Sequence, residues 1–255
     1  MSRFVRHFGI DYSGAATPET PLSGLRVYEA LPGGAPIERR PADGRHWSRR
    51  GLADWLEAEL RSGPPTLVAI DHAFSLPQAY VDAHGLPPDW RVLLDDFTRH
   101  WPTDQTGARV AELRQGEGGR QRGGEARWRR LCDRRARAKS PFHFGVPGSV
   151  ASSTHAGLPW LRHLRQALGP GLHVWPFDGW QPPAGVSVLA EGYPSLWNQA
   201  WPRNGRTPDQ HDAWTLAQVL AQADTEGHLE AWFEPALASE ERAQAQTEGW
   251  ILGLV

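Results

Sequence analysis

The sequence predicts a single α/β domain, because strand-like and helix-like patterns are interleaved along a chain long enough for one sizeable core. The chain has 255 residues, of which 40% are hydrophobic. Apolar runs of strand length occur at residues 4–10, 25–31, 66–70, 172–177 and 187–190, with a sixth candidate near Ile37.

Helical spacing of apolar residues appears between these runs. It marks one helix over residues 52–60, a second over 158–168 and a third over 213–223. A block of strands followed by helices that alternate with strands indicates a mixed sheet flanked by helices. We therefore treat residues 1–255 as one domain.

An arginine-rich insertion at about residues 95–150 interrupts this pattern. From Arg99 to Lys139 there are twelve Lys or Arg residues against five Asp or Glu. Residues 114–125, RQGEGGRQRGGE, lack apolar periodicity and predict a mobile loop, whereas residues 128–139 predict a basic helix.

Basic side chains next to aromatic ones are typical of proteins that hold a nucleic acid strand. Four aromatic residues accompany the insertion: Trp101, Trp128, Phe142 and Phe144. The basic residues predicted to contact nucleic acid are Arg127, Arg130, Arg134, Arg137 and Lys139. A solvated, arginine-rich surface without a ligand is an equally good interpretation.

The start of the chain predicts neither a secretion signal nor a membrane span. MSRFVRHFGID carries charges throughout and has no uninterrupted apolar stretch, so we expect a cytoplasmic protein without a membrane partner. The single cysteine, Cys132, excludes an internal disulfide and a typical zinc site.

Two aspartates follow predicted strands directly. Asp71 ends the run TLVAI, whose continuous apolar character indicates a central strand, and Asp11 ends the first run. The carboxyl ends of parallel neighbours meet at one edge of a sheet, where ligands bind in α/β folds. Two adjacent carboxylates are unfavourable without a compensating cation, which indicates a metal site.

The segment TPDQHDAWTLAQVL, residues 207–220, adds two more acids. Thr207 as N-cap, Pro208 at the first helical position and Gln210 in a capping box fix the start of a helix. The apolar stripe of this helix then extends back onto Asp209 and Asp212. Asp209 could also be only a first-turn acid that interacts with the helix dipole.

Glu191 is a fifth candidate acid, since it follows the run VLA as Asp71 follows its strand. A glutamate that caps the next turn or pairs with an arginine explains this position equally well.

Several segments together resemble a family of uncharacterised proteins described as predicted nucleases with an RNase H-like fold. The segments are GIDYSG (9–14), VAIDHAFSLP (68–77), VWPFDGW (174–180), AEGYPSLW (190–197), DQHDAW (209–214) and EGWILGL (248–254). In the wider superfamily, which includes Holliday-junction resolvases, acids lie on the first strand, the fourth strand and a late helix. Asp11, Asp71 and the Asp209/Asp212 pair match these positions.

The resemblance implies a five-stranded mixed sheet, two bound Mg²⁺ or Mn²⁺ ions and hydrolysis of phosphodiester bonds in DNA or RNA. The arginine-rich insertion is not part of the shared core. The catalytic set would be Asp11, Asp71, Asp209, Asp212 and Glu191, with the four aspartates as metal ligands.

Two other functions remain open. A non-catalytic nucleic-acid-binding or scaffold module could use the same fold, with the insertion as its working surface. An actin-like phosphotransferase would also begin with a motif such as GIDYSG, but it needs a second phosphate-binding loop, and the chain has no GK[ST] loop. A serine hydrolase lacks its G-x-S-x-G motif.

Overall fold

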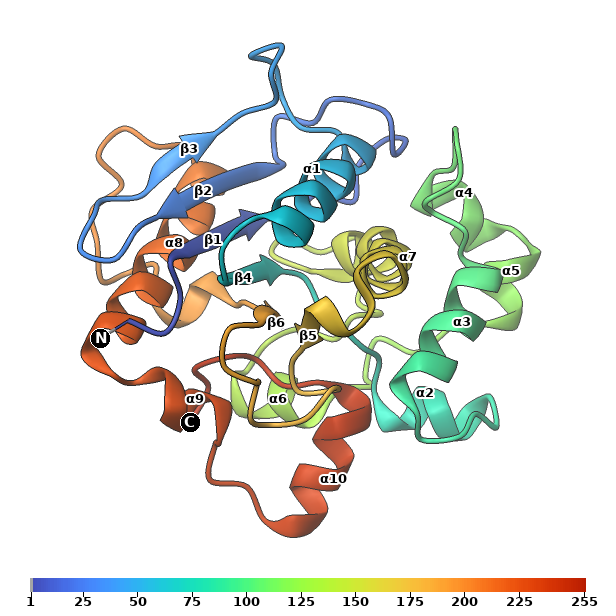
Figure 1. Cartoon of the computed structure of the whole chain (residues 1–255). Coiled ribbons are helices and arrows are strands. Elements are labelled where there is room, and N and C mark those ends of the chain that lie inside the picture. Colours follow the sequence, from blue (N-terminus) through green and yellow to red (C-terminus); the bar gives the residue numbers. More distant parts are fainter. Residues whose placement is uncertain (1) are drawn as a thin grey trace.

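The sheet is built around β1 (Arg6–Asp11) and β4 (Thr66–Asp71), which pair in parallel at its centre. In the computed structural model, which describes residues 2–255, the strand order is β3-β2-β1-β4-β6-β5 (Figure 1). The antiparallel part contains β2 (Arg26–Ala30) and β3 (Ile37–Arg39). The parallel part continues with β6 (Ser187–Glu191) and β5 (Leu172–Val174).

The α/β class with a mixed sheet is confirmed, but the expected five strands are six. The short run near Ile37, the sixth candidate in the sequence, forms β3 at one edge of the sheet, and Leu172–Val174 forms β5 at the other edge. The three residues of β3 pair only with β2, so this strand extends the antiparallel side and leaves the centre of the sheet unchanged.

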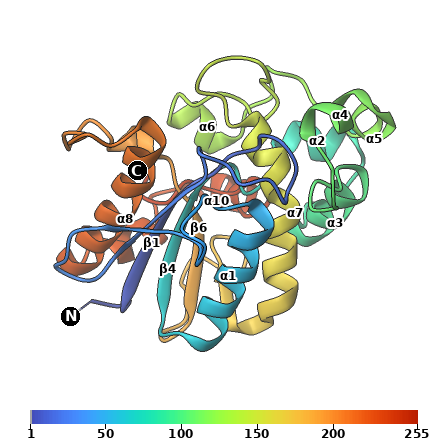
Figure 2. The same ribbon diagram turned by 90° about the horizontal axis from the view of Figure 1, so that it is seen from above.

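Helices cover both faces of the sheet. Figure 2 shows α8 (Pro208–Glu226) on one side and α1 (Arg49–Ser62) and α7 (Ala151–Leu168) on the other. These are the three helices that the apolar spacing predicts. The segment between β4 and α7 holds α2 (Gln78–Ala83), α3 (Trp90–His100), α4 (Val110–Gln115), α5 (Glu117–Gln121) and α6 (Leu131–Arg135). The remaining elements are the 3-10 turns η1 (Gly169–Gly171) and η2 (Pro194–Leu196), followed by α9 (Leu229–Phe233) and α10 (Ser239–Glu248).

Alternation along β4 divides its side chains between two cores. Val68 and Ile70 pack with α1 and α7, whereas Leu67 and Ala69 pack with α8 and the C-terminal segment. The same alternation in β1 sends Phe8 and Ile10 to the α1/α7 side. A central strand with apolar residues on both faces is what the continuous run TLVAI predicts.

Helix α8 lies unusually close to β1 at Gly9. A Cβ atom on Gly9 would lie 2.2 Å from the carbonyl oxygen of Ala213 and 2.3 Å from the backbone nitrogen of Ala217. Both of these atoms belong to the helix backbone, so they cannot move aside as a flexible side chain would. The small residues on both sides therefore set the separation between helix and strand.

The predicted loop at residues 114–125 is wrong over residues 114–115, which end α4, and over residues 117–121, which form α5. A Cβ on Gly118 would lie 2.0 Å from the carbonyl oxygen of His100, so this glycine lets α5 approach the end of α3. Trp101 donates to the Arg122 carbonyl at 3.1 Å, and Arg122 pairs with Asp96 at 2.7 Å. The glycines in this run serve close packing.

The predicted basic helix over residues 128–139 is shorter than expected, since α6 spans only Leu131–Arg135. The insertion is not a separate body: Phe97, Trp101, Val110 and Phe142 belong to the same buried cluster as the α1/α7 side of the sheet. Several aromatic residues of the insertion therefore pack in the core of the protein.

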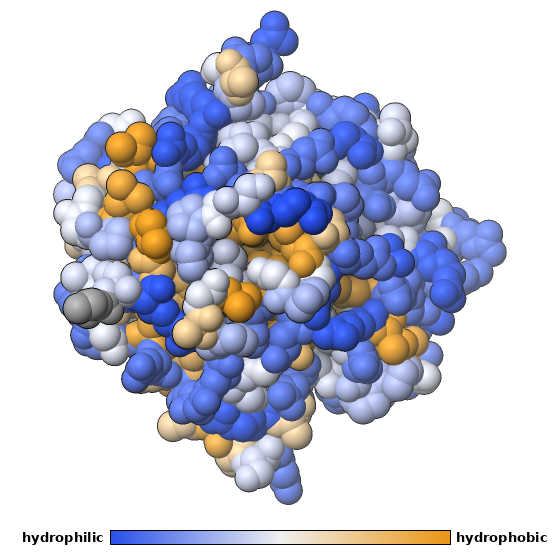
Figure 3. All heavy atoms as spheres, in the orientation of Figure 1, coloured by the Kyte–Doolittle hydropathy of each residue, from blue (hydrophilic) through white to orange (hydrophobic). Residues whose placement is uncertain are grey.

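The surface is mostly hydrophilic on the face that Figure 3 shows, with hydrophobic residues in small patches. The large hydrophobic residues exposed in the described part of the chain are Val5, Leu31, Ile37, Val92 and Val255. In residues 2–255, no helix combines the length and apolar character that crossing a membrane requires.

We predict that Gly9→Ala lowers the free energy of unfolding by about 1–3 kcal/mol, because the added methyl group overlaps the α8 backbone. Gly171→Ala is the control, since a Cβ at Gly171 meets nothing within 4 Å; it should change stability by less than about 0.5 kcal/mol. Urea unfolding of both variants measures the difference. Equal stabilities would contradict the proposed contact.

Candidate active site

Asp11 and Asp71 end neighbouring strands and face the same side of the sheet. They are the last residues of β1 and β4, and their Cα atoms are partners in the parallel register. Alternation places both on the side of Leu67 and Ala69, which is the side that α8 covers. The expected meeting of the two acids at the carboxyl edge of the sheet is therefore observed.

Helix α8 begins above this edge. Thr207 accepts from the backbone nitrogen of Gln210, and the Gln210 side chain accepts from the Thr207 nitrogen, which completes the predicted capping box. Asp209 and Asp212 lie in the first two turns of the helix, ahead of Ala213. The contact of Ala213 with Gly9 therefore brings the start of α8 over β1.

The electrostatics show that these acids share one environment. Burial raises the pKa of Asp11 well above its usual value, and the charges of Asp71, Asp209 and Asp212 raise it further. Burial, then the charges of Asp212 and Glu191, raise the pKa of Asp71 to about 8. Burial also raises the pKa of Asp212, against a hydrogen bond from Asn198 at 3.2 Å.

The four aspartates converge, but they do not form a closed ligand cage. Among residues 2–255, no group of three or more His, Cys, Asp or Glu side chains is arranged to hold a metal ion as it stands. Carboxylates that raise one another's pKa lie close enough to interact electrostatically. Holding a metal ion also requires their oxygen atoms to point at one position. Metal binding at these residues therefore stays a prediction.

Glu191 occupies the end of β6 in a different role from the aspartates. Its Cα is the partner of Ile70, and alternation places it on the opposite face from Asp71. The carboxylate is buried and accepts two hydrogen bonds of 2.6 Å from the Arg130 guanidinium and one of 2.9 Å from the Phe74 nitrogen. Pairing with an arginine accounts for its position.

The structure corrects the assignment of Arg130 to a nucleic-acid surface. Arg130 is 1% exposed, and its guanidinium pairs with Asp133 at 2.8 Å as well as with Glu191. These two carboxylates raise the pKa of Arg130 against the effect of its burial. Burial between two acids leaves no donor at the surface, so Arg130 joins the insertion to the end of β6.

The other predicted basic residues lie nearer to solvent. Arg127, Arg134 and Arg137 are exposed, with Arg127 in a surface ion pair with Glu125 at 2.7 Å. Lys139 is half-buried, donates to the Pro147 carbonyl and lines a narrow pocket of about 20 Å³ together with Asp71. Contact of these four residues with nucleic acid stays a prediction.

A buried arginine that the sequence did not single out shapes the turn after Asp11. Arg49, in the first turn of α1, is 0% exposed and donates to the carbonyls of Ser13 at 3.2 Å, Ala15 at 2.5 Å and Ala16 at 3.1 Å. Carbonyl oxygens that converge on one guanidinium fix the path of the turn. No pattern in the sequence distinguishes Arg49 from the other arginines.

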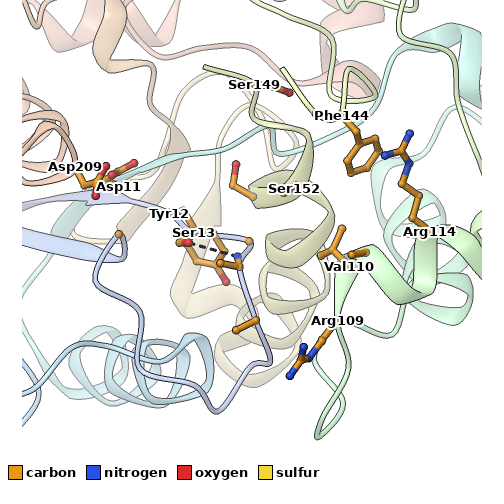
Figure 4. Close-up of a pocket in the computed structure, with 17 residues that line it drawn as sticks. Asp11, Tyr12, Ser13, Arg109, Val110, Arg114, Phe144, Ser149, Ser152 and Asp209 are labelled. Carbon is orange, nitrogen blue, oxygen red and sulfur yellow. Dashed lines mark hydrogen bonds between the residues drawn. The ribbon is translucent and has the colours of Figure 1, made fainter. Parts of the chain in front are cut away.

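A cleft of about 720 Å³ opens beside Asp11 and Asp209. The turn after Asp11 forms one wall, and Gly14 lets it lie against the start of α7, since a Cβ there would meet the Ser152 carbonyl oxygen at 2.1 Å. Figure 4 shows the two aspartates on one side of the cleft and Arg109, Arg114 and Phe144 on the other.

Arg109 and Arg114 are the site residues that the sequence prediction missed. Both belong to the basic segment from Arg99 to Lys139, which gave the only signal. That signal cannot choose among twelve basic residues, because the path of the chain decides which of them face the cleft.

Comparison with known proteins gives no relative for this chain: no family model, curated protein or solved structure matches it. The RNase H-like assignment and the nuclease class stay predictions.

We predict that Arg130→Met lowers the free energy of unfolding by about 3–5 kcal/mol, because Glu191 and Asp133 are left buried without a cation. The control is Arg135→Met, which removes a pair with Glu241 whose side chains are 33% and 34% exposed. It should cost no more than about 1 kcal/mol. Chemical unfolding measures both, and comparable small losses would show that the buried network is unimportant.

A second prediction concerns pH in metal-free buffer. The pKa of Asp71 is about 8 in the folded protein and about 3.9 in an unfolded chain. Between these values the folded state holds a proton that the unfolded state releases, so stability falls as pH rises. Asp71→Asn removes this contribution.

The measurement is the free energy of unfolding of wild type and Asp71→Asn from pH 4 to pH 8 with EDTA. We expect the wild type to lose stability relative to Asp71→Asn as pH rises. Asp54→Asn, at an exposed position of α1, is the matched control and should follow the wild-type curve. Parallel curves for wild type and Asp71→Asn would refute the prediction.

Proposed function

We propose that this chain is a metal-dependent nuclease that hydrolyses phosphodiester bonds, with nucleic acid as its partner. The observation that carries the proposal is the pairing of Asp11 and Asp71 at the carboxyl edge of the sheet, with Asp209 and Asp212 at the start of α8 and a cleft with arginines on its far wall beside Asp11 and Asp209. Their positions on the first strand, the fourth strand and a late helix match the resemblance to the RNase H-like superfamily.

The chemistry of these residues suits Mg²⁺ or Mn²⁺, which prefer carboxylate oxygens. Asp11 and Asp71 are partly buried, and their charges repel each other. A bound cation would reduce the unfavourable free energy of keeping both carboxylates ionised. The ligand set would be Asp11, Asp71 and Asp212, assisted by Asp209. Since no preformed group of three ligands exists in residues 2–255, binding would require these side chains to reorient.

Two bound ions would supply an activated water and stabilise charge on the leaving oxygen. The chain itself supplies the negative charge that would retain the ions. Arg49 holds the turn that follows Asp11, and Asn198 holds the carboxylate of Asp212 by its hydrogen bond. Glu191 would act indirectly, because its carboxylate already pairs with Arg130.

The test is hydrolysis of branched, double-stranded and single-stranded DNA and RNA with Mn²⁺ and with Mg²⁺. We expect Asp11→Asn and Asp71→Asn each to reduce the rate by more than ~100-fold, since loss of outer-shell partners alone costs ~10–100-fold. Asp54→Asn, at an exposed position of α1 that does not line the cleft, is the control and should retain the wild-type rate.

Retained hydrolysis in Asp11→Asn and Asp71→Asn would overturn the proposal. Absence of hydrolysis from the wild type on all substrates, together with binding of nucleic acid, would support the non-catalytic module instead.

A further inference from the structure

The far wall of the cleft carries positive charge that no buried carboxylate neutralises. Arg109 is 55% exposed and meets only Glu112, at 3.8 Å, in an ion pair whose glutamate is 69% exposed. Arg114 is exposed, and the ion pairs found among residues 2–255 do not include it. Both line the same cleft as Asp11 and Asp209. The cleft therefore has a basic and an acidic end.

Phe144 holds the guanidinium of Arg114 in place. The Arg114 Cζ atom lies 4.4 Å from the centroid of the Phe144 ring, and this ring lies 4.7 Å from the centroid of the buried His155. Packing on an aromatic ring orients a planar guanidinium and leaves its other face and its N–H groups accessible. Figure 4 shows Arg114 and Phe144 side by side at the wall of the cleft.

The shape of the cleft limits what can enter. It is an open cleft bordered by the turn after Asp11, the start of α7 and the segment around Arg109 and Phe144, and its volume of about 720 Å³ is of the size that holds a small ligand or a short piece of a polymer. A duplex presents stacked, paired bases behind a broad phosphate surface. A single strand can enter a recess, where its bases stack on planar groups.

We propose that this cleft binds a short segment of single-stranded nucleic acid, with Arg109 and Arg114 holding the backbone phosphates that flank the one at the aspartates. The free face of the Arg114 guanidinium supports an unpaired base. This inference rests on the proposed nuclease function and names its substrate class. It also moves the contact surface from the residues around α6 to those around α4.

The test is fluorescence anisotropy with a labelled 12-nucleotide oligo(dT) strand in Ca²⁺, a hard cation that carboxylate oxygens also bind, and gel analysis of the strand checks that no hydrolysis accompanies binding. We expect Arg109→Ala and Arg114→Ala each to raise Kd about tenfold and to reduce the slope of log Kd against log salt by about 0.7. Arg114→Lys keeps the positive charge but lacks the planar guanidinium, so its Kd should lie between those of the wild type and Arg114→Ala.

The matched control is Arg120→Ala, an exposed arginine of the same insertion on α5 that does not line the cleft. It should leave Kd and the salt slope unchanged. Because Arg109 and Arg114 are exposed, their variants should unfold at the wild-type temperature, which separates lost binding from lost structure.

Three outcomes overturn the inference: wild-type Kd values in Arg109→Ala and Arg114→Ala, a larger loss in Arg127→Ala than in Arg114→Ala, or tighter binding of the matching duplex than of the single strand. The hydrolysis assay judges the nuclease proposal separately. Arginine-dependent binding without hydrolysis would refute the nuclease alone, and hydrolysis with arginine-independent binding would refute the cleft assignment alone.

Discussion

The contact between α8 and β1 at Gly9 is the constraint on which the site depends. The helix backbone lies so close to the strand that a single methyl group on Gly9 would overlap Ala213 and Ala217. This separation places the start of α8, with Asp209 and Asp212, over the ends of β1 and β4. A longer separation would reduce the burial that chiefly raises the pKa of Asp11, and would weaken the added repulsion from Asp209 and Asp212. The packing of small residues thus generates the electrostatic character of the carboxyl edge.

A second buried interaction attaches the insertion to this edge. Arg130 joins Glu191 at the end of β6 to Asp133 on α6, and all three side chains are shielded from water. Glu248, near the C-terminus, accepts from the backbone nitrogens of Gln78 and Leu131 and ties the insertion to the end of the chain. The insertion is therefore held by buried charges and by aromatic core contacts, and its arginines divide into two groups. One is internal and structural, and the other lines the cleft or faces solvent.

The cleft has acidic side chains on one wall and basic side chains on the other, and the two groups come from distant parts of the sequence. The aspartates that line it, Asp11 and Asp209, come from β1 and α8, whereas Arg109 and Arg114 come from α4 and its N-terminal flank. An anionic polymer would be attracted by the basic end and repelled by the acidic end unless cations were present. The proposed metal dependence and the proposed strand-binding wall are therefore two aspects of one charge distribution.

The sequence by itself determined the α/β class, the three main helices, the capping box at Thr207 and the placement of Asp11 and Asp71 at strand ends. These follow from local periodicity and capping, which depend on neighbours in the chain. It did not determine that parts of RQGEGGRQRGGE belong to α4 and α5, that Arg130 is buried, that Arg49 holds the turn after Asp11, or that Arg109 and Arg114 line the same cleft as Asp11 and Asp209. Each of these features depends on contacts between distant segments. The sequence does not show whether an arginine is exposed to water or buried between two carboxylates. Only the tertiary structure decides which, because burial and partner charge are properties of the packed chain.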